Sequence, residues 1–290
     1  MTEPNLDIIK ETLVALARQA GEVMKEKSGK TSFDDKANAV DLVTEIDKAV
    51  EELVHNALTV AFPEYKFLGE ESYVPGESEL TDEPTFILDP IDGTTNFIHS
   101  YPSYCISLGF ALNKKPTVGV VYNPVTNQLF SAIKGKGAYL NGTQKLPLTA
   151  PRPLKLQSAL LAIEWGSDRT GNNFKVKTDT FKSLAADSKD GGAFAHGFRS
   201  AGSAALNISY AAAGYIDAYW EGGCWAWDVC AGWIILEEAG GIMAGGNKGE
   251  WHPAVDSRLY FAVRGAEPAE QKKFVEDFWG HIQGTLDYKV

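Results

Sequence analysis

Cysteine is scarce in this 290-residue sequence, which contains only Cys105, Cys224 and Cys230 and no Cys-x-x-Cys pair. An odd number of scattered cysteines argues against a disulfide framework, and the missing pair argues against a thiolate zinc site or a thioredoxin-type redox motif. The five histidines form no ligand pattern either. We therefore expect the cysteines to be small, buried hydrophobic residues, and we do not expect zinc.

Positive charge and long apolar runs are also lacking. Lys and Arg number 27 against 38 Asp and Glu, and the net charge of −11 repels nucleic acid and anionic membranes. The longest apolar stretch, around residues 229–236, is far shorter than the ~20 residues of a membrane span. No basic patch followed by an apolar run marks a targeting peptide at the N-terminus. We expect a cytoplasmic protein with neither nucleic acid nor membrane as a partner.

Two common catalytic signatures are missing as well. The sequence has no Gly-x-Ser-x-Gly nucleophile elbow and no Gly-x-Gly-x-x-Gly dinucleotide fingerprint. What is present, 44% hydrophobic and 22% charged residues, is typical of a folded chain rather than of disorder. At about 150 residues per domain, the length allows about two domains.

Hydrophobic periodicity predicts the first half of the fold. Apolar residues recur at helical steps over 6–25 and, after Thr44 as the N-cap, from Ile46 to Ala61, just before Pro63. Short apolar runs separated by turn residues then predict an antiparallel meander. Its expected strands are residues 86–88, 105–112, 117–122 and 128–133.

Segment 149–153 is the best candidate boundary, because Pro151 and Pro153 resist both helix and central strand. We expect an N-terminal α+β half over 1–150 with most of the candidate metal ligands, and a C-terminal α/β half over 151–290. The fold class is therefore mixed, with paired layers of helices and sheets. In the second half the expected strands are 159–163, 215–220 and 259–263, and the expected helices lie near 203–213, at 228–238 and from about 267.

The most informative residues are acidic and follow an apolar strand. Pro90 and Gly93 force an abrupt turn there. This turn is expected to aim Asp89, Asp92 and the carbonyl of Ile91 into one space. Oxygen ligands on a rigid turn suit a hard cation.

Four further acidic residues each have a simpler alternative explanation. Asp228 opens a later helix, where an isolated carboxylate is favoured by the helix dipole. Glu70 and Glu71 follow a short apolar run and are also compatible with a solvated turn. Asp47 comes three residues after Thr44 and is also compatible with a capping interaction. None of these positions decides the function alone.

Convergence of these carboxylates would require a counter-charge. Two like charges 4 Å apart repel by ~4 kcal/mol at an effective dielectric of ~20, so the cluster needs a cation or takes up protons. The oxygen-only ligand set favours Mg²⁺ or Mn²⁺. A magnesium site also accounts for phosphate binding by an acidic protein. Gly93, Thr94 and Thr95 add backbone N–H donors if a helix starts there.

Five stretches of the sequence resemble the ordered motifs of the inositol monophosphatase family of Mg²⁺-dependent phosphomonoesterases. The likeness extends from about residue 36 to residue 241, and Ser203 stands where Thr is usual. Residues 163–198 carry no family motif. The stretches are Asp41 to Asp47, Gly69 to Ser72, Asp89 to Phe97, Arg199 to Ala205 and Trp227 to Gly232.

The resemblance implies a five-layered α-β-α-β-α sandwich, usually a homodimer. It implies hydrolysis of myo-inositol monophosphates to myo-inositol and phosphate, a step of inositol biosynthesis, by direct attack of metal-activated water. Two or three Mg²⁺ per subunit are implied. Glu70, Asp89 and the Ile91 carbonyl would hold the first, Asp89, Asp92 and Asp228 the second, and Glu70 a third, looser ion. Lithium sensitivity is a further expectation.

The resemblance also implies roles for single residues. Thr94 and Asp47 would orient and deprotonate the water, with Glu70 as the third catalytic residue, which makes the capping interpretation of Asp47 the weaker one. Glu221 would bind ring hydroxyls, as suits a polyol phosphate. The phosphate would rest on the Gly93 and Thr94 amides. The implied substrate pocket consists of Glu70, Ile91, Asp92, Gly93, Thr94, Gly202, Ser203, Ala204, Glu221 and Asp228.

Two alternatives come from other functional classes. The chain could keep the fold but serve as a binding or regulatory partner, although it retains every implied metal carboxylate. It could also be a glycoside hydrolase that uses two carboxylates, but Thr94, Thr95 and the remaining acidic residues would then have no role. The preferred inositol isomer is left open.

Overall fold

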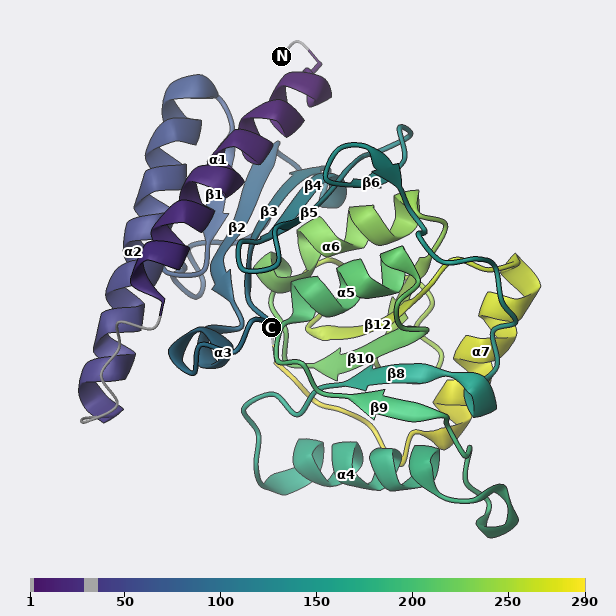
Figure 1. The fold of residues 1–290 in the computed structure, drawn as a ribbon. Coiled ribbons are helices and arrows are strands. Elements are labelled where there is room, and N and C mark those ends of the chain that lie inside the picture. The colour runs from purple at the N-terminus through teal and green to yellow at the C-terminus, as the bar shows by residue number, and fades with distance from the viewer. Residues whose placement is uncertain (1–2, 29–35, 290) are drawn as a thin grey trace.

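The chain folds into five alternating layers of helix and sheet. The computed structural model describes residues 3–28 and 36–289, and the side chains of 36–42 lie outside the description. The helices are α1 (Leu6–Lys27), α2 (Lys36–Ala61), α3 (Thr94–Ile98), α4 (Gly171–Ala185), α5 (Ala204–Ala213), α6 (Ala226–Glu238) and α7 (Pro268–His281). In Figure 1, α1 and α2 cover one sheet, α5 and α6 fill the middle, and α4 and α7 cover the other sheet. The α-β-α-β-α sandwich is therefore confirmed.

The first sheet is a meander, as predicted. Its strand order follows the chain, with a parallel pair at the start and antiparallel pairs thereafter. The predicted strands 105–112 and 128–133 have the observed bounds, whereas 86–88 and 117–122 extend further in the structure. The strands are β1 (Lys66–Gly69), β2 (Thr85–Asp92), β3 (Cys105–Leu112), β4 (Lys115–Asn123), β5 (Gln128–Ile133), β6 (Ala138–Leu140) and β7 (Gln144–Lys145).

The second sheet lies entirely beyond residue 153. Its strands are β8 (Leu160–Ile163), β9 (Gly197–Arg199), β10 (Ala218–Gly222), β11 (Ile242–Gly245) and β12 (Leu259–Val263), in the spatial order β11-β12-β10-β8-β9. The strand predicted at 215–220 is observed three residues later, at 218–222, because the chain first turns at Gly214, whose φ is +80°. Since α5 and α6 pack against both sheets, the two halves share one apolar core.

The predicted start of the second helix is wrong. Helix α2 begins at Lys36, so Thr44 lies inside the helix and is not its N-cap. The apolar stripe extends upstream of the predicted start through Val43, which is 1% exposed and continues the spacing of Ile46, Val50 and Val54. Four of the eight residues over 36–43 are good helix formers, and the continuing apolar stripe outweighs the local preference of threonine for a cap.

Two glycines bring α6 close to the first sheet. A Cβ at Gly119 would lie 2.3 Å from the carbonyl oxygen of Ala231, and a Cβ at Gly109 would lie 2.6 Å from Cys230 Sγ. Any larger residue at either position would push the helix away from the sheet. This close packing carries the first turn of α6, which contains Asp228, to the ends of β2 and β3.

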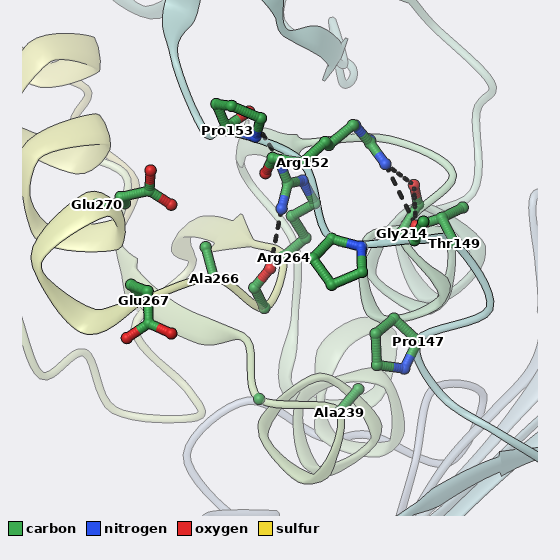
Figure 2. A pocket seen from close by; sticks show the side chains of 14 residues that line it. Pro147, Thr149, Arg152, Pro153, Gly214, Ala239, Arg264, Ala266, Glu267 and Glu270 are labelled. Carbon is green, nitrogen blue, oxygen red and sulfur yellow. Dashed lines mark hydrogen bonds between the residues drawn. The ribbon is translucent and has the colours of Figure 1, made fainter.

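The proline-rich segment between the halves is fastened by two arginines. Arg264 Nε and Arg152 Nη2 both donate to Asp217 Oδ1, at 2.6 and 3.0 Å. Figure 2 shows the cavity of about 520 Å³ beside them, with Glu267 and Glu270 on its opposite side. Both guanidinium groups beside this cavity already donate to protein oxygens, and these bonds hold the proline-rich segment to the second half of the chain.

All three cysteines are free and buried, as predicted. Within the described ranges, no helix is long and apolar enough to cross a membrane.

Candidate active site

Three aspartates converge at one edge of the first sheet. Asp89 and Asp92 lie at the end of β2, where the pairing with β3 shifts register between them, and Asp228 lies in the first turn of α6. One carboxylate oxygen of each falls within 4.8 Å of the others. Ser107, the β3 partner of Asp89, donates to the carbonyl oxygen of Trp227 at 2.9 Å and so ties the helix to the strand. The strand-end pattern of the sequence thus corresponds to a real cluster.

Asp92 is anchored at the start of α5. Its carboxylate accepts hydrogen bonds from Ser203 Oγ at 2.6 Å and from the backbone N–H groups of Ala205 and Ala204 at 2.7 and 3.2 Å. Burial raises the pKa of Asp92 to about 6, while these hydrogen bonds oppose the rise. The donors fix the direction in which Asp92 presents its oxygens.

Asp89 has no such support. It is 2% exposed, and its Oδ1 atom has no hydrogen-bond partner among the described residues. Burial raises its pKa well above the usual range, and the charges of Glu70, Asp92 and Asp228 raise it further. A buried, unpartnered carboxylate oxygen among like charges is strongly unfavourable without a cation. The site therefore fits a metal ion that prefers oxygen ligands.

Asp228 has both of the roles considered for it from the sequence, a contact at the start of a helix and membership of the acidic cluster. Its Oδ2 atom accepts a 2.6 Å hydrogen bond from the backbone N–H of Trp225, which is the N-cap residue of α6. The same carboxylate faces Asp89 and Asp92. Burial, followed by the charges of Asp92 and Glu70, raises its pKa well above the usual range. The helix-terminal contact thus orients a residue of the acidic cluster.

Glu70 and Asp47 lie on the other side of this cluster. Glu70 follows β1 and its side chain is exposed to solvent, while desolvation of its carboxylate beside the charges of Glu71, Asp92 and Glu51 raises its pKa to about 7. Burial raises the pKa of Asp47 to about 8, with the charges of Glu70, Glu71 and Glu51 contributing. Glu70 is exposed in the turn after β1, as the solvated-turn interpretation expects, and it is also close enough to the cluster for its charge to raise the pKa of Asp89.

The capping interpretation of Asp47 is wrong. Asp47 lies inside α2 together with Thr44, and its Oδ1 atom is buried without a hydrogen-bond partner in the described part of the chain. Residue 41, which belongs to the same motif, has a side chain outside the described residues. Asp47 thus presents an unpartnered carboxylate oxygen from the outer helical layer, and Glu70 is near enough for its charge to raise the pKa of Asp47.

The turn between β2 and α3 requires glycine. Gly93 has a φ of +95°, and a Cβ there would lie 2.9 Å from the carbonyl oxygen of Ser103 and 3.1 Å from that of Gly202. Helix α3 begins at the next residue, which meets the condition under which Gly93, Thr94 and Thr95 were expected to offer backbone N–H donors. Thr94 Oγ1 donates to the carbonyl oxygen of Ile91 at 3.1 Å. The turn therefore brings one backbone oxygen and one hydroxyl to the cluster.

A cavity of about 580 Å³ opens beside the aspartates. It contains six residues of the implied substrate pocket, whereas four others, Glu70, Ile91, Gly93 and Thr94, do not line it. The six are Asp92, Gly202, Ser203, Ala204, Glu221 and Asp228.

Glu221 is the second-last residue of β10 and lines the cavity. Its Oε2 atom accepts a 2.6 Å hydrogen bond from the Tyr219 hydroxyl. Burial raises its pKa to about 7, and the charge of Glu164 adds to the rise while Lys177 opposes it. An acceptor group thus lines the same cavity as Asp92 and Asp228.

Sequence reasoning missed Glu164, although it follows an apolar strand as the other acidic residues do. It is 6% exposed, and its Oε1 atom accepts from Ala201 N at 2.6 Å, Gly202 N at 2.9 Å and Asn207 Nδ2 at 2.9 Å. Glu164 thereby fixes the loop that leads to Ser203. Lys177, described below, was missed as well.

Comparisons with known proteins agree with this geometry. The model of the inositol monophosphatase family matches residues 5–283. Inositol monophosphatase 2 of Saccharomyces cerevisiae is 55% identical and inositol monophosphatase 1 of the same yeast is 48% identical, with at least 98% of each chain aligned. The solved inositol monophosphatase of Anabaena has 30% identity and a TM-score of 0.77, covering 97% of this chain and 98% of its own.

Proposed function

The chain belongs to the inositol monophosphatase family and is a phosphoric monoester hydrolase, and from this premise we propose that it hydrolyses myo-inositol monophosphates to myo-inositol and phosphate by direct attack of water. The observation that carries the proposal is the cluster of Asp89, Asp92 and Asp228 beside a cavity that Glu221 also lines. The names of the two yeast relatives support the substrate. Family membership sets aside the glycoside hydrolase alternative.

The proposed cofactor is Mg²⁺, with Mn²⁺ as a substitute, at two or three sites per subunit. Glu70, Asp89 and the Ile91 carbonyl would hold one ion. Asp89, Asp92 and Asp228 would hold a second, and Glu70 alone a third, looser one. The unpartnered Oδ1 of Asp89 supports this assignment. When bound, such ions lower the pKa of water and neutralise charge that develops on phosphate.

Asp47 and Thr94 are the proposed residues that position the attacking water. Asp47 has a buried carboxylate oxygen with no hydrogen-bond partner among the described residues, so this oxygen is available to accept a proton from water. Thr94 Oγ1 donates a hydrogen bond to the Ile91 carbonyl, so the lone pairs of the hydroxyl oxygen are left to accept a hydrogen bond from water. Asp47 would therefore receive the proton while Thr94 fixes the direction of attack.

Recognition of the substrate is divided between a phosphate site at the start of α3 and the cavity that Glu221 lines. The phosphate would rest near the backbone N–H groups of Gly93 and Thr94, and the ring hydroxyls would donate to Glu221. Gly202, Ser203 and Ala204 would line the wall between them. A carboxylate at Glu221 accepts hydrogen bonds from neutral hydroxyls and repels a second phosphate. A monophosphate is therefore favoured over 3′-phosphoadenosine 5′-phosphate or fructose 1,6-bisphosphate.

Three coarser features are proposed on the same basis. The division into halves at residues 150 and 151 remains a prediction. So do the homodimer and the cytoplasmic location. Light scattering of the purified protein would measure the number of subunits, and imaging of a tagged full-length chain would report the location.

A phosphate-release assay tests the proposed function. The purified protein is given myo-inositol 1-phosphate, 3′-phosphoadenosine 5′-phosphate and fructose 1,6-bisphosphate, each with Mg²⁺ and with EDTA. We expect the highest kcat/KM for the inositol phosphate and no turnover in EDTA. A higher kcat/KM for either bisphosphate would overturn the substrate. Absence of turnover on all phosphomonoesters would favour the binding or regulatory alternative.

A further inference from the structure

A buried lysine lies behind the wall of the substrate cavity. Lys177 projects from α4 and is fully buried, with 0% exposure. Its ammonium group donates to the carbonyl oxygen of Trp165 at 3.0 Å and to that of Gly222 at 2.9 Å. Trp165 lies in the loop after β8, and Gly222 ends β10 directly after Glu221. One cation thus joins the ends of two neighbouring strands, β8 and β10, where both line the cavity.

The ammonium and the Glu221 carboxylate approach the same glycine. A Cβ at Gly166 would lie 3.0 Å from Lys177 Nζ and 3.7 Å from Glu221 Oε1. Gly166 also has a φ of +60°, which disfavours any other residue. The close approach explains why the positive charge of Lys177 opposes the rise in the pKa of Glu221. The position of Lys177 therefore bears directly on the residue proposed to bind the polyol.

The C-terminal segment seals this arrangement from outside. The Tyr288 ring lies with its centroid 5.3 Å from Lys177 Nζ, within the range of a cation–π contact. The ring also packs on the end of β10, because a Cβ at Gly222 would lie 2.7 Å from Tyr288 Cε2. Tyr288 itself lines the cavity.

Asparagine side chains hold this C-terminal segment in place. Asn173 accepts from the backbone N–H of Asp287 and donates to its carbonyl oxygen, both at 2.8 Å. Asn247 makes the same pair of bonds with Leu286, both at 2.9 Å. The segment is therefore a fixed part of the cavity.

We propose that Lys177 is a positioning residue for polyol recognition: covered by Tyr288, its buried ammonium locks the end of β10 to the loop after β8 and so holds Glu221 against the ring hydroxyls of the substrate. The inference rests on the proposed function, because it concerns the same cavity. Lys177 acts through the main chain and does not touch the reacting phosphate.

This role predicts an effect that depends on the substrate. The aspartate cluster acts on the phosphate of every phosphomonoester, whereas Glu221 acts only on a substrate with hydroxyl groups to donate. Loss of the lock should therefore weaken binding of an inositol phosphate and leave a hydroxyl-free substrate unchanged. General damage to the fold would lower both activities together.

The test compares Lys177→Met with the wild-type enzyme on myo-inositol 1-phosphate and on 4-nitrophenyl phosphate at saturating Mg²⁺. We expect KM for the inositol phosphate to rise about ten-fold with kcat within about two-fold, as for the loss of one well-placed charged contact. Both constants for 4-nitrophenyl phosphate should stay within about two-fold. Lys175→Met is the matched control, since Lys175 lies on the same helix but is exposed, and it should behave as wild type.

A double-mutant cycle then asks whether Lys177 acts through Glu221. In a Glu221→Gln background, Lys177→Met should change KM for the inositol phosphate by no more than about two-fold, because the group that it positions is already impaired. A full, independent ten-fold effect in that background would overturn the proposal. Equal losses on both substrates would overturn it too.

A second variant keeps the test decisive if Lys177→Met does not fold, as judged by circular dichroism. Tyr288→Ala removes the cover and lets water reach the ammonium, and it should raise KM for the inositol phosphate selectively, by about three-fold. A Tyr288→Ala enzyme identical to wild type on both substrates would contradict the proposal. Wild-type enzyme that hydrolyses 4-nitrophenyl phosphate but not the inositol phosphate would instead overturn the proposed function, before any variant is compared.

Discussion

Ser203 Oγ lies 2.6 Å from Asp92 Oδ2 and joins the start of α5 to the end of β2. The two residues are 111 positions apart in the chain. The same hydroxyl accepts from Leu206 N at 3.3 Å and so caps α5. One side chain thus stabilises a helix and orients a proposed metal ligand.

Ser203→Ala should reduce both stability and apparent Mg²⁺ affinity. The variant loses a cap and removes one of the hydrogen-bond donors to Asp92, while the backbone donors of Ala204 and Ala205 remain, so the free energy of unfolding should fall by about 1–3 kcal/mol. The Mg²⁺ concentration for half-maximal activity should rise about ten-fold, as for other residues that orient metal ligands. Chemical denaturation and a Mg²⁺ titration of activity would measure the two effects. Ser203→Thr keeps the hydroxyl and is the control; a Thr variant as impaired as the Ala variant would contradict this role.

Asp89→Asn should separate activity from stability. Because Asp89 is buried among like charges and has a pKa well above the usual range, a neutral amide should make the metal-free protein more stable by about 1 kcal/mol or more. Activity should fall by about 100-fold or more, since the residue is shared by both proposed metal sites. Thermal unfolding in EDTA and phosphate release with Mg²⁺ would test the two expectations. Wild-type turnover in the variant, or its failure to fold, would falsify the assignment.

The sequence predicted the acidic cluster because its members share a local signature. Asp89 and Asp92 lie at the end of the fully buried strand β2, directly before the turn at Gly93. Such strand ends meet at one edge of a sheet, so their convergence is readable from sequence. The start of α2 could not be predicted from the sequence in this way, because the threonine at position 44 has the chemistry of a cap but lies within a longer apolar stripe.

The missed residues depend on partners that are distant in the chain. Glu164 gains its role from Ala201, Gly202 and Asn207, which are 37 to 43 positions away. The buried ammonium of Lys177 donates a hydrogen bond to the carbonyl oxygen of Gly222, which is 45 positions away. A single lysine in an amphipathic helix normally indicates a solvated face, and nothing local marks this one as buried. Only the assembled cavity shows what these residues do.

The metal-free protein should lose stability as pH rises. Asp47, Glu70 and Glu221 have folded-state pKa values of about 8, 7 and 7, all above the values of unfolded carboxyl groups. Between about pH 5 and pH 8 the folded state therefore binds more protons than the unfolded state, and stability falls with pH. In EDTA, Tm should drop by at least about 3 °C from pH 6 to pH 8.

Divalent metal should reverse this trend, because deprotonated carboxylates bind it best. The rise in Tm on adding Mg²⁺ should therefore be larger at pH 8 than at pH 6. Asp47→Asn removes the group with the highest of these three pKa values and should flatten the pH dependence in EDTA. A metal-free Tm that rises between pH 6 and pH 8 would contradict the assigned pKa directions.

Lithium should inhibit the enzyme through the second proposed metal site. Li⁺ is close to Mg²⁺ in size but carries half its charge, and Asp89, Asp92 and Asp228 offer only oxygen ligands within 4.8 Å of one another. This site is expected to empty after the alcohol leaves, so Li⁺ would bind mainly after that step and delay the release of phosphate. Inhibition should therefore be uncompetitive towards the substrate, and excess Mg²⁺ should weaken it. Steady-state kinetics at graded LiCl and constant ionic strength, with NaCl as the control, would decide. A purely competitive pattern, or no effect at tens of millimolar, would rule out this account of the second site.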